Sequence, residues 1–277
     1  MTRATAFGAT MGGLKEAGMA DTKTAVANKP VWVDLSSDDA AASREFYAKL
    51  FGWKVEVNPD PQYGGYAMAN VGDRAVAGIG PKMSPQAPTA WSIYIGTEDA
   101  KALAGKVEAA GGTVIAPPFS VGDQGVMATF QDPTGAIISA WQPGRMAGVL
   151  PSGAPNTFAW AELNARGIEK AIPFYAATFG WTAKKSEMGE GAPPYTEFQL
   201  GGESIAGGTE MNSMVPAQVP SYWIVYFGVD DVDGAFKKAR KEGAEEMLAP
   251  MDFPGGRFGI VRDPQGAAFG LLKMKPR

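Results

Sequence analysis

Apolar residues with a two-residue period alternate along the chain with apolar residues at helical spacing. In the first strand signal, Val31, Val33 and Leu35 share one face, and a uniformly apolar face is expected to pack against helices. Trp32 and Asp34 must then point to the opposite face of the same strand.

The period changes to that of a helix directly after this strand. Ser37 or Asp38 is suited to cap the helix, and Gly52 is suited to end it. The predicted apolar stripe consists of Ala42, Phe46, Tyr47, Leu50 and Phe51. A second helix with the same kind of stripe is predicted to end at Gly111 and Gly112.

The same pattern is written twice. FYAKLFGW at residues 46–53 returns as FYAATFGW at residues 174–181, an offset of 128 residues. The turn sequence DPTG at residues 132–135 is answered by DPQG at residues 263–266. These matches indicate an internal duplication of about 130 residues.

Each half contains two rounds of strand, helix and three strands. The sequence therefore predicts an α+β fold built from four βαβββ modules. The expected organisation is a disordered extension at residues 1–28, domains at 29–143 and 157–277, and a linker rich in Pro and Gly at 144–156.

Composition excludes several functional classes. The 277 residues carry a net charge of -4 without a basic cluster, which disfavours nucleic acid as a partner. No apolar run is long enough to span a membrane, and the N-terminal segment does not resemble a signal peptide, so a cytoplasmic protein is expected. Without Cys, the chain has no thiolate nucleophile or thiolate metal ligand.

The order and spacing of these motifs resemble the vicinal oxygen chelate superfamily, which includes glyoxalases, bleomycin resistance proteins and extradiol dioxygenases. The resemblance is carried by Asp39, Phe46, Tyr47, Phe51, Gly52, Gly111, Gly112 and the turn 132–135. It covers nearly everything from residue 30 to 275. The resemblance implies two glyoxalase-like curved mixed sheets with helices on the outside and a ligand-holding cup inside each sheet.

Strand alternation predicts which side chains face these cups. In the first strand of the second half, Ala159, Ala161 and Leu163 are expected to face helices. The residues expected to face the cups are Trp32, Asp34, Ser92, Tyr94, Ser139 and Trp141 in the first half, and Phe158, Trp160, Glu162, Ile224, Tyr226, Gly270 and Leu272 in the second. An aromatic lining with one carboxylate and one phenol suits a small, flat, partly polar ligand.

Metal-using members of the family take their ligands from the cup-facing strands. The matching positions in the first half are Trp32, or Val33 if the register is shifted by one residue, Ser92, Ser139 and a position near Gly78 or Ile79. In the second half they are Trp160, Ile224, Gly270 and the neighbourhood of Gly207. These residue types bind divalent ions poorly. No metal and no cofactor are therefore expected.

Two functions of different class fit this pattern. One is a binding protein that sequesters a small molecule, with Trp32, Ser92, Ser139, Trp141, Phe158, Trp160, Ile224 and Leu272 lining the cups. The other is a metal-independent isomerase or lyase. Glu162 or Asp34 would be its general base, and Tyr226 or Tyr94 would donate a hydrogen bond to an enolate. Core packing alone would equally explain Trp32 and Trp160, and either a monomer or a homodimer is compatible with four modules in one chain.

Overall fold

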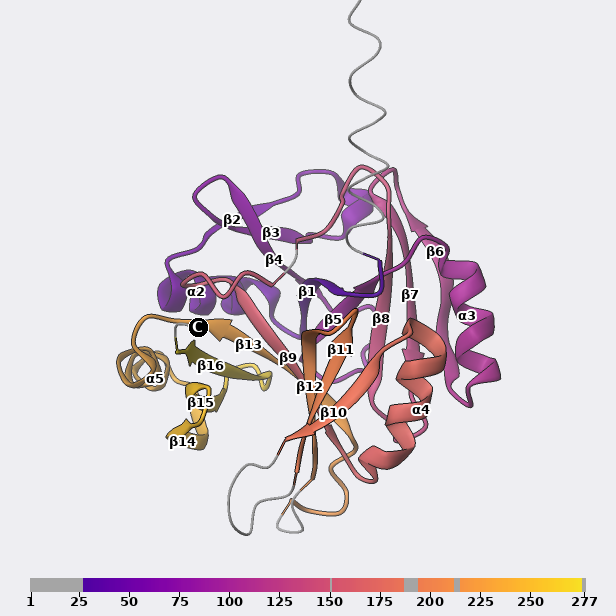
Figure 1. Cartoon of the computed structure of the whole chain (residues 1–277). Helices are drawn as coiled ribbons and strands as arrows, with labels where there is room; N and C mark the ends of the chain where they lie inside the picture. Colours follow the sequence, from indigo (N-terminus) through magenta and orange to yellow (C-terminus); the bar gives the residue numbers. More distant parts are fainter. Residues whose placement is uncertain (1–26, 150, 187–193, 212–214, 276–277) are drawn as a thin grey trace, which may run out of the picture.

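A computed structural model describes residues 27–149, 151–186, 194–211 and 215–275 (Figure 1). The extension expected at residues 1–28 lies almost entirely outside this range. Two eight-stranded mixed sheets and four α-helices make up the described chain, which confirms the predicted α+β fold of four βαβββ modules.

The first two modules form the first sheet. Their elements are β1 (Pro30–Ser37), α2 (Ala40–Phe51), β2 (Lys54–Val57), a 3₁₀ turn (Pro61–Tyr63), β3 (Ala67–Val71), β4 (Arg74–Pro81), β5 (Ala90–Gly96), α3 (Ala100–Ala109), β6 (Thr113–Val121), β7 (Gly125–Gln131) and β8 (Ile137–Pro143). The strand order is β2-β3-β4-β1-β5-β8-β7-β6, so the first strands of the two modules lie together at the centre.

The third and fourth modules repeat this order. Their elements are β9 (Phe158–Ala165), α4 (Ile168–Phe179), β10 (Thr182–Ser186), β11 (Tyr195–Leu200), β12 (Glu203–Glu210), β13 (Tyr222–Gly228), α5 (Val232–Lys241), β14 (Glu245–Phe253), β15 (Gly256–Arg262) and β16 (Ala268–Met274). The order β10-β11-β12-β9-β13-β16-β15-β14 matches that of the first sheet strand for strand.

The ends of α2 follow from local sequence, with one correction. Asp39 is the N-cap, and its side chain accepts a hydrogen bond of 2.9 Å from the backbone N–H of Ala42. The predicted caps, Ser37 and Asp38, were one or two residues early, since the Ser37 hydroxyl instead accepts from the backbone N–H of Asp39. Gly52 ends the helix at a φ of 70°, as the sequence predicts.

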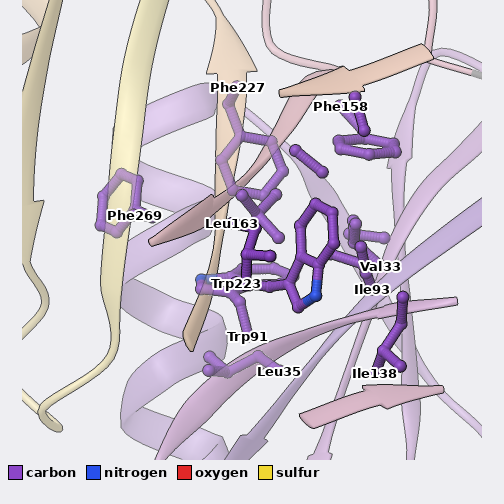
Figure 2. Close-up of a cluster of buried hydrophobic side chains, with 14 of the residues drawn as sticks. Val33, Leu35, Trp91, Ile93, Ile138, Phe158, Leu163, Trp223, Phe227 and Phe269 are labelled. Carbon is purple, nitrogen blue, oxygen red and sulfur yellow. The ribbon is translucent and has the colours of Figure 1, made fainter. Parts of the chain in front are cut away.

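The two sheets share one hydrophobic core on their helix-bearing faces. Helix α2 lies beside α5, and α3 lies beside α4 (Figure 1), while β5 contacts β13 between these helix pairs. Figure 2 shows side chains from both sheets in this core, among them Trp91 and Ile93 of the first and Trp223 and Phe227 of the second. The opposite, concave faces of the sheets therefore point away from each other.

The duplicated phrase joins the two domains. The Tyr47 hydroxyl donates to Asp263 Oδ2 at 2.8 Å, and Trp91 Nε1 donates to the same hydroxyl oxygen at 2.8 Å. Trp53 Nε1 donates to the backbone carbonyl of Asn156 at 2.7 Å. Both acceptors lie outside the first sheet. Asp263 is in the turn before β16, and Asn156 lies two residues before β9.

The second copy makes the reciprocal contacts. Tyr175 donates to Asp132 Oδ2 at 2.8 Å and accepts from Trp223 Nε1 at 2.9 Å. Trp181 Nε1 donates to the carbonyl of Asn28 at 2.7 Å. The repeated phrase and the two aspartate turns thus join the domains through two equivalent sets of hydrogen bonds, which are called the double clasp below.

Bulges change the face of three predicted residues. The pairing of β1 with β5 shifts register between Pro30 and Trp32, and Val31 packs with Trp32 on the concave face. The pairing of β9 with β13 shifts in the same way, so Phe158 lies in the shared core and Ala159 packs on the concave side. The predictions for Val31, Phe158 and Ala159 were wrong because an extra residue at a bulge inverts alternation beyond it.

Candidate functional site

The first concave face is organised around the carboxyl group of Asp34 at the centre of β1. The Tyr94 hydroxyl on β5 lies within hydrogen-bonding reach of this carboxyl group. Tyr66, directly before β3, brings a second phenol close to the same carboxyl group. Trp32 Nε1 donates to the Tyr66 hydroxyl at 3.1 Å. Trp32, Tyr66, Tyr94 and Asp34 are called the first cup network below.

Burial dominates the electrostatics of this network. Desolvation raises the pKa of Asp34 from 3.8 to about 7, and the hydrogen bond from Tyr94 only partly opposes it. Burial also raises the pKa of Tyr94 and Tyr66 well above 10, so both phenols stay protonated as donors. The Asp34 residue keeps some accessible surface, so its carboxyl group is strongly desolvated without being sealed from the concave face.

The second concave face repeats the arrangement around Glu162 on β9. The Tyr226 hydroxyl donates to Glu162 Oε1 at 3.2 Å, and Asn164 Nδ2 donates to the same oxygen at 3.4 Å. Tyr195 is a third donor to this carboxylate, and Trp160 Nε1 donates to the Tyr195 hydroxyl at 2.9 Å. These five residues are called the second cup network. Burial raises the pKa of Glu162, while all three hydrogen bonds oppose that rise.

Tyr66 and Tyr195 were not among the predicted site residues. Tyr66 lies directly before β3 and Tyr195 is the first residue of β11, so strand alternation does not predict which way either side chain points. Their phenols lie over glycines: a methyl group on Gly78 would be 1.7 Å from the Tyr66 hydroxyl oxygen, and one on Gly207 would be 1.8 Å from that of Tyr195. Glycine at both repeat positions was the signal that another group fills this space.

The remaining predicted residues of the first half surround its network. Ser92 lies opposite Asp34 in the strand register, and Ser139 lies opposite Tyr94. Ser139 is buried and its hydroxyl is 3.1 Å from that of Thr129. Trp141 packs on Trp32 and Tyr94 in one cluster, and its Nε1 donates to the carbonyl of Met146 at 2.8 Å.

In the second half, three of the predicted lining residues lie on the concave face and one does not. Ile224 lies opposite Glu162, and Leu272 packs in the same cluster as Ile224, Tyr226 and Trp160. Phe158 is excluded from this face by the bulge described above. The ring of Tyr226 covers Gly270, where a methyl group would lie 2.0 Å from Tyr226 Cδ1.

The side chains of neither cup fit a divalent metal of the kind that the family resemblance implies. Each network offers one carboxyl group. The other polar side-chain groups are phenols and an indole in both cups, with the amide of Asn164 in addition in the second, and these groups bind such ions weakly. Within the described ranges, no three His, Cys, Asp or Glu side chains gather in a way that could hold a metal ion. Tyr66 and Tyr195 moreover fill the space over Gly78 and Gly207.

The networks can bind or position a polar group. A carboxyl group beside phenol donors can accept a hydrogen bond from a hydroxyl group or take a proton, and a phenol can donate to a carbonyl oxygen.

No helix among the described residues is long and apolar enough to cross a membrane.

Comparison with protein families places two matches on these two domains. The family described as Glyoxalase/Bleomycin resistance protein/Dioxygenase superfamily matches residues 29–139 and 157–271. A protein of Mycobacterium tuberculosis named "Putative glyoxylase CFP32" is 39% identical over 254 residues, which cover 90% of this chain and 95% of that protein. The "Anthracycline biosynthesis protein DnrV" of Streptomyces peucetius is 35% identical, over 89% of this chain and 93% of that protein.

Solved structures show the same fold at low sequence identity. The Mn(II)-bound glyoxalase from Novosphingobium aromaticivorans aligns with a TM-score of 0.60 at 16% identity, over 89% of this chain and 82% of that chain. The 2,3-dioxygenase LapB from Pseudomonas sp. KL28 aligns with a TM-score of 0.62 at 14% identity, over 90% and 93% of the two chains.

Proposed function

We propose that this chain, which belongs to the glyoxalase, bleomycin resistance protein and dioxygenase superfamily, binds a small, partly aromatic or carbonyl-containing molecule in its aromatic-lined cups. Binding of the sequestering kind found in bleomycin resistance proteins would need no metal. The proposed protein is cytoplasmic, a monomer or a homodimer, and has neither nucleic acid nor membrane as a partner.

The repeated tryptophan, carboxyl and phenol network is the observation that carries this proposal. The two copies come from corresponding positions of the two domains and place donors and an acceptor beside an indole. Such a group can hold the polar edge of a flat ligand whose apolar body lies on the surrounding side chains. The names of the Streptomyces relatives, which refer to anthracycline biosynthesis, are in keeping with an aromatic ligand.

Calorimetric titration with acetophenone and with phenylglyoxal tests the proposal. The wild-type protein is expected to bind at least one of them. Glu162→Gln is expected to change the dissociation constant several-fold because Tyr195 and Tyr226, the donors available to a ligand carbonyl, lose their carboxyl partner. Glu98→Gln is the matched control, since Glu98 is exposed before α3. The absence of binding to either compound would contradict the proposal.

One observation favours a metal-independent isomerase or lyase as the second candidate. The pKa of Asp34, about 7, lies where a general base works best near neutral pH. Asp34 would take a proton from the carbon beside a ligand carbonyl, and Tyr94 would donate a hydrogen bond to the oxygen of the resulting enolate. Glu162 and Tyr226 would hold the same two roles in the second cup.

Substitution of Asp34 separates the two candidates. In water phenylglyoxal is hydrated and carries a hydrogen on the diol carbon beside its ketone; an isomerase using this base would move that proton to the neighbouring carbon and form mandelate. Asp34→Asn should lower this turnover by about 100-fold or more, with its affinity for the compound retained. A binding protein should have no turnover to lose. Asp73→Asn, in the exposed turn between β3 and β4, is the control.

A further inference from the structure

We infer that the second cup takes a flat polycyclic aromatic molecule with hydroxyl or keto groups along one edge. This inference rests on the proposed function and names its ligand class. The argument combines an exposed apolar wing of the second sheet with the hydrogen-bonding network at the centre of the same concave face.

The wing consists of apolar side chains on the three outer strands. Leu248 of β14 lies opposite Ile260 of β15, and Met251 of β14 lies opposite Phe258. Phe258 in turn lies opposite Leu272 of β16. Phe258, Ile260 and Leu272 belong to the cluster of Ile224 and Tyr226, so side chains in register with them face the cup as well.

The outer edge of this wing is open. Leu248 is 36% exposed and Met251 is 46% exposed, both in a strand that forms the edge of the sheet. The described residues packed against the cluster all belong to the strands of the second sheet itself. A planar apolar molecule lying here would remove these side chains from water.

The first cup differs at the corresponding place. Its wing carries the hydroxyl pair Thr129 and Ser139 instead of Ile260 and Gly270. The segment after β8 covers its cluster, because Met146 and Val149 pack on it and the Met146 carbonyl accepts from Trp141 Nε1. The chain therefore supplies its own apolar cover to the first cup. The carbonyl of that cover binds Trp141, whose counterpart in the second cup is the apolar Leu272.

This cover over the first cup indicates which features a ligand of the second cup should have. A ligand there must bring apolar area for the wing and polar atoms for the network of Glu162, Tyr195 and Tyr226. The distance from β13 to β14 is three strand spacings, or about 14 Å, which favours several fused rings over a single ring. A ligand hydroxyl group would donate to Glu162, which has the acceptor capacity of a carboxylate.

Binding of 1,8-dihydroxyanthraquinone, followed by quenching of tryptophan fluorescence, tests the inference. Acetophenone serves as the single-ring comparison. The test variant is Met251→Glu, which places a charge on the exposed wing. Met83→Glu, at a residue of the first domain that is 79% exposed, is the matched control.

The expected result is that Met251→Glu weakens 1,8-dihydroxyanthraquinone binding by about tenfold or more, while Met83→Glu leaves it unchanged and acetophenone binding changes little in both. Equal affinity of the two variants for 1,8-dihydroxyanthraquinone would overturn the inference. Binding of acetophenone without binding of 1,8-dihydroxyanthraquinone would also overturn it and leave the proposed function standing. Failure of both compounds to bind would overturn both.

Discussion

The two cups place a carboxyl group at the same position of the same fold, yet the two carboxyl groups have different sets of hydrogen-bond donors. Asp34 has the Tyr94 hydroxyl as its hydrogen-bond donor, and its pKa rises to about 7. Glu162 has three donors, Tyr195, Tyr226 and Asn164, which oppose the effect of burial on its pKa. The comparison teaches that burial is the largest influence on both pKa values, and that the hydrogen-bond donors around each carboxyl group decide how far its effect is opposed.

The cups also differ in what lies over them. Met146 and Val149 pack on the first cup, whereas the second has an apolar wing with Leu248 and Met251 exposed at its edge. A duplicated domain can therefore cover part of one cup with its own chain and leave the apolar wing of the other cup exposed.

The largest expected effect is the loss of folding stability that follows when the buried Asp34 carboxyl group ionises at high pH. Its pKa in the folded protein is raised, so the folded state binds more protons than the unfolded state between pH 3.8 and about 7. Stability from this group is fully present below pH 3.8 and is lost as the pH rises through about 7. Asp34→Asn should therefore stabilise the protein at pH 8 to 9 by at most roughly 4 kcal/mol.

Denaturant unfolding at pH 4 and at pH 8.5 measures this difference. The gain of Asp34→Asn should be confined to the higher pH. A gain of the same size at both pH values would contradict a raised pKa for Asp34.

The next largest effect is expected at the position that holds Gly270 in one cup and Ser139 in the other. Gly270→Ala should cost about 3 kcal/mol, because its methyl group would lie 2.0 Å from the ring of Tyr226. Ser139→Ala should cost about 1 kcal/mol through the lost hydroxyl contact with Thr129. Chemical denaturation of both variants provides the measurement, and equal costs would show that the second cup has room over Gly270.

A smaller and equal effect is expected where the two halves are alike. Tyr47→Phe and Tyr175→Phe each remove a donor to a buried aspartate and an acceptor for a tryptophan. Each variant should lose about 2 kcal/mol of stability. Thermal unfolding of the two variants should give the same shift, and a clear inequality would mean that the double clasp is not symmetric.

The fold could be predicted because the sequence patterns that specify it are local and occur in both halves of the chain. The helix stripe with Phe46 and Tyr47, the αL position of Gly52 and the turn at Asp132 each follow from residue type and spacing. The duplication then set the number and order of modules. The contacts of Tyr47 with Asp263 could not be predicted, since they depend on how the two domains pack.

The site was predicted only in part, for physical reasons. The alternation of Trp32 with Asp34 and of Trp160 with Glu162 identified the strand positions of the two networks. The bulges before Trp32 and Trp160 depend on the partner strands and displaced Val31 and Phe158. Tyr66 and Tyr195 reach the networks from loop ends, where periodicity carries no information.

A titration of the carboxyl carbons by ¹³C NMR would test the account most directly. Asp34→Asn and Glu162→Gln would assign the two signals. We predict that the Asp34 carboxyl group titrates with a midpoint of about pH 7, and that the midpoint of Glu162 lies above 4.5. A midpoint near 3.8 for Asp34 would contradict the claim that the first cup holds a desolvated carboxyl group.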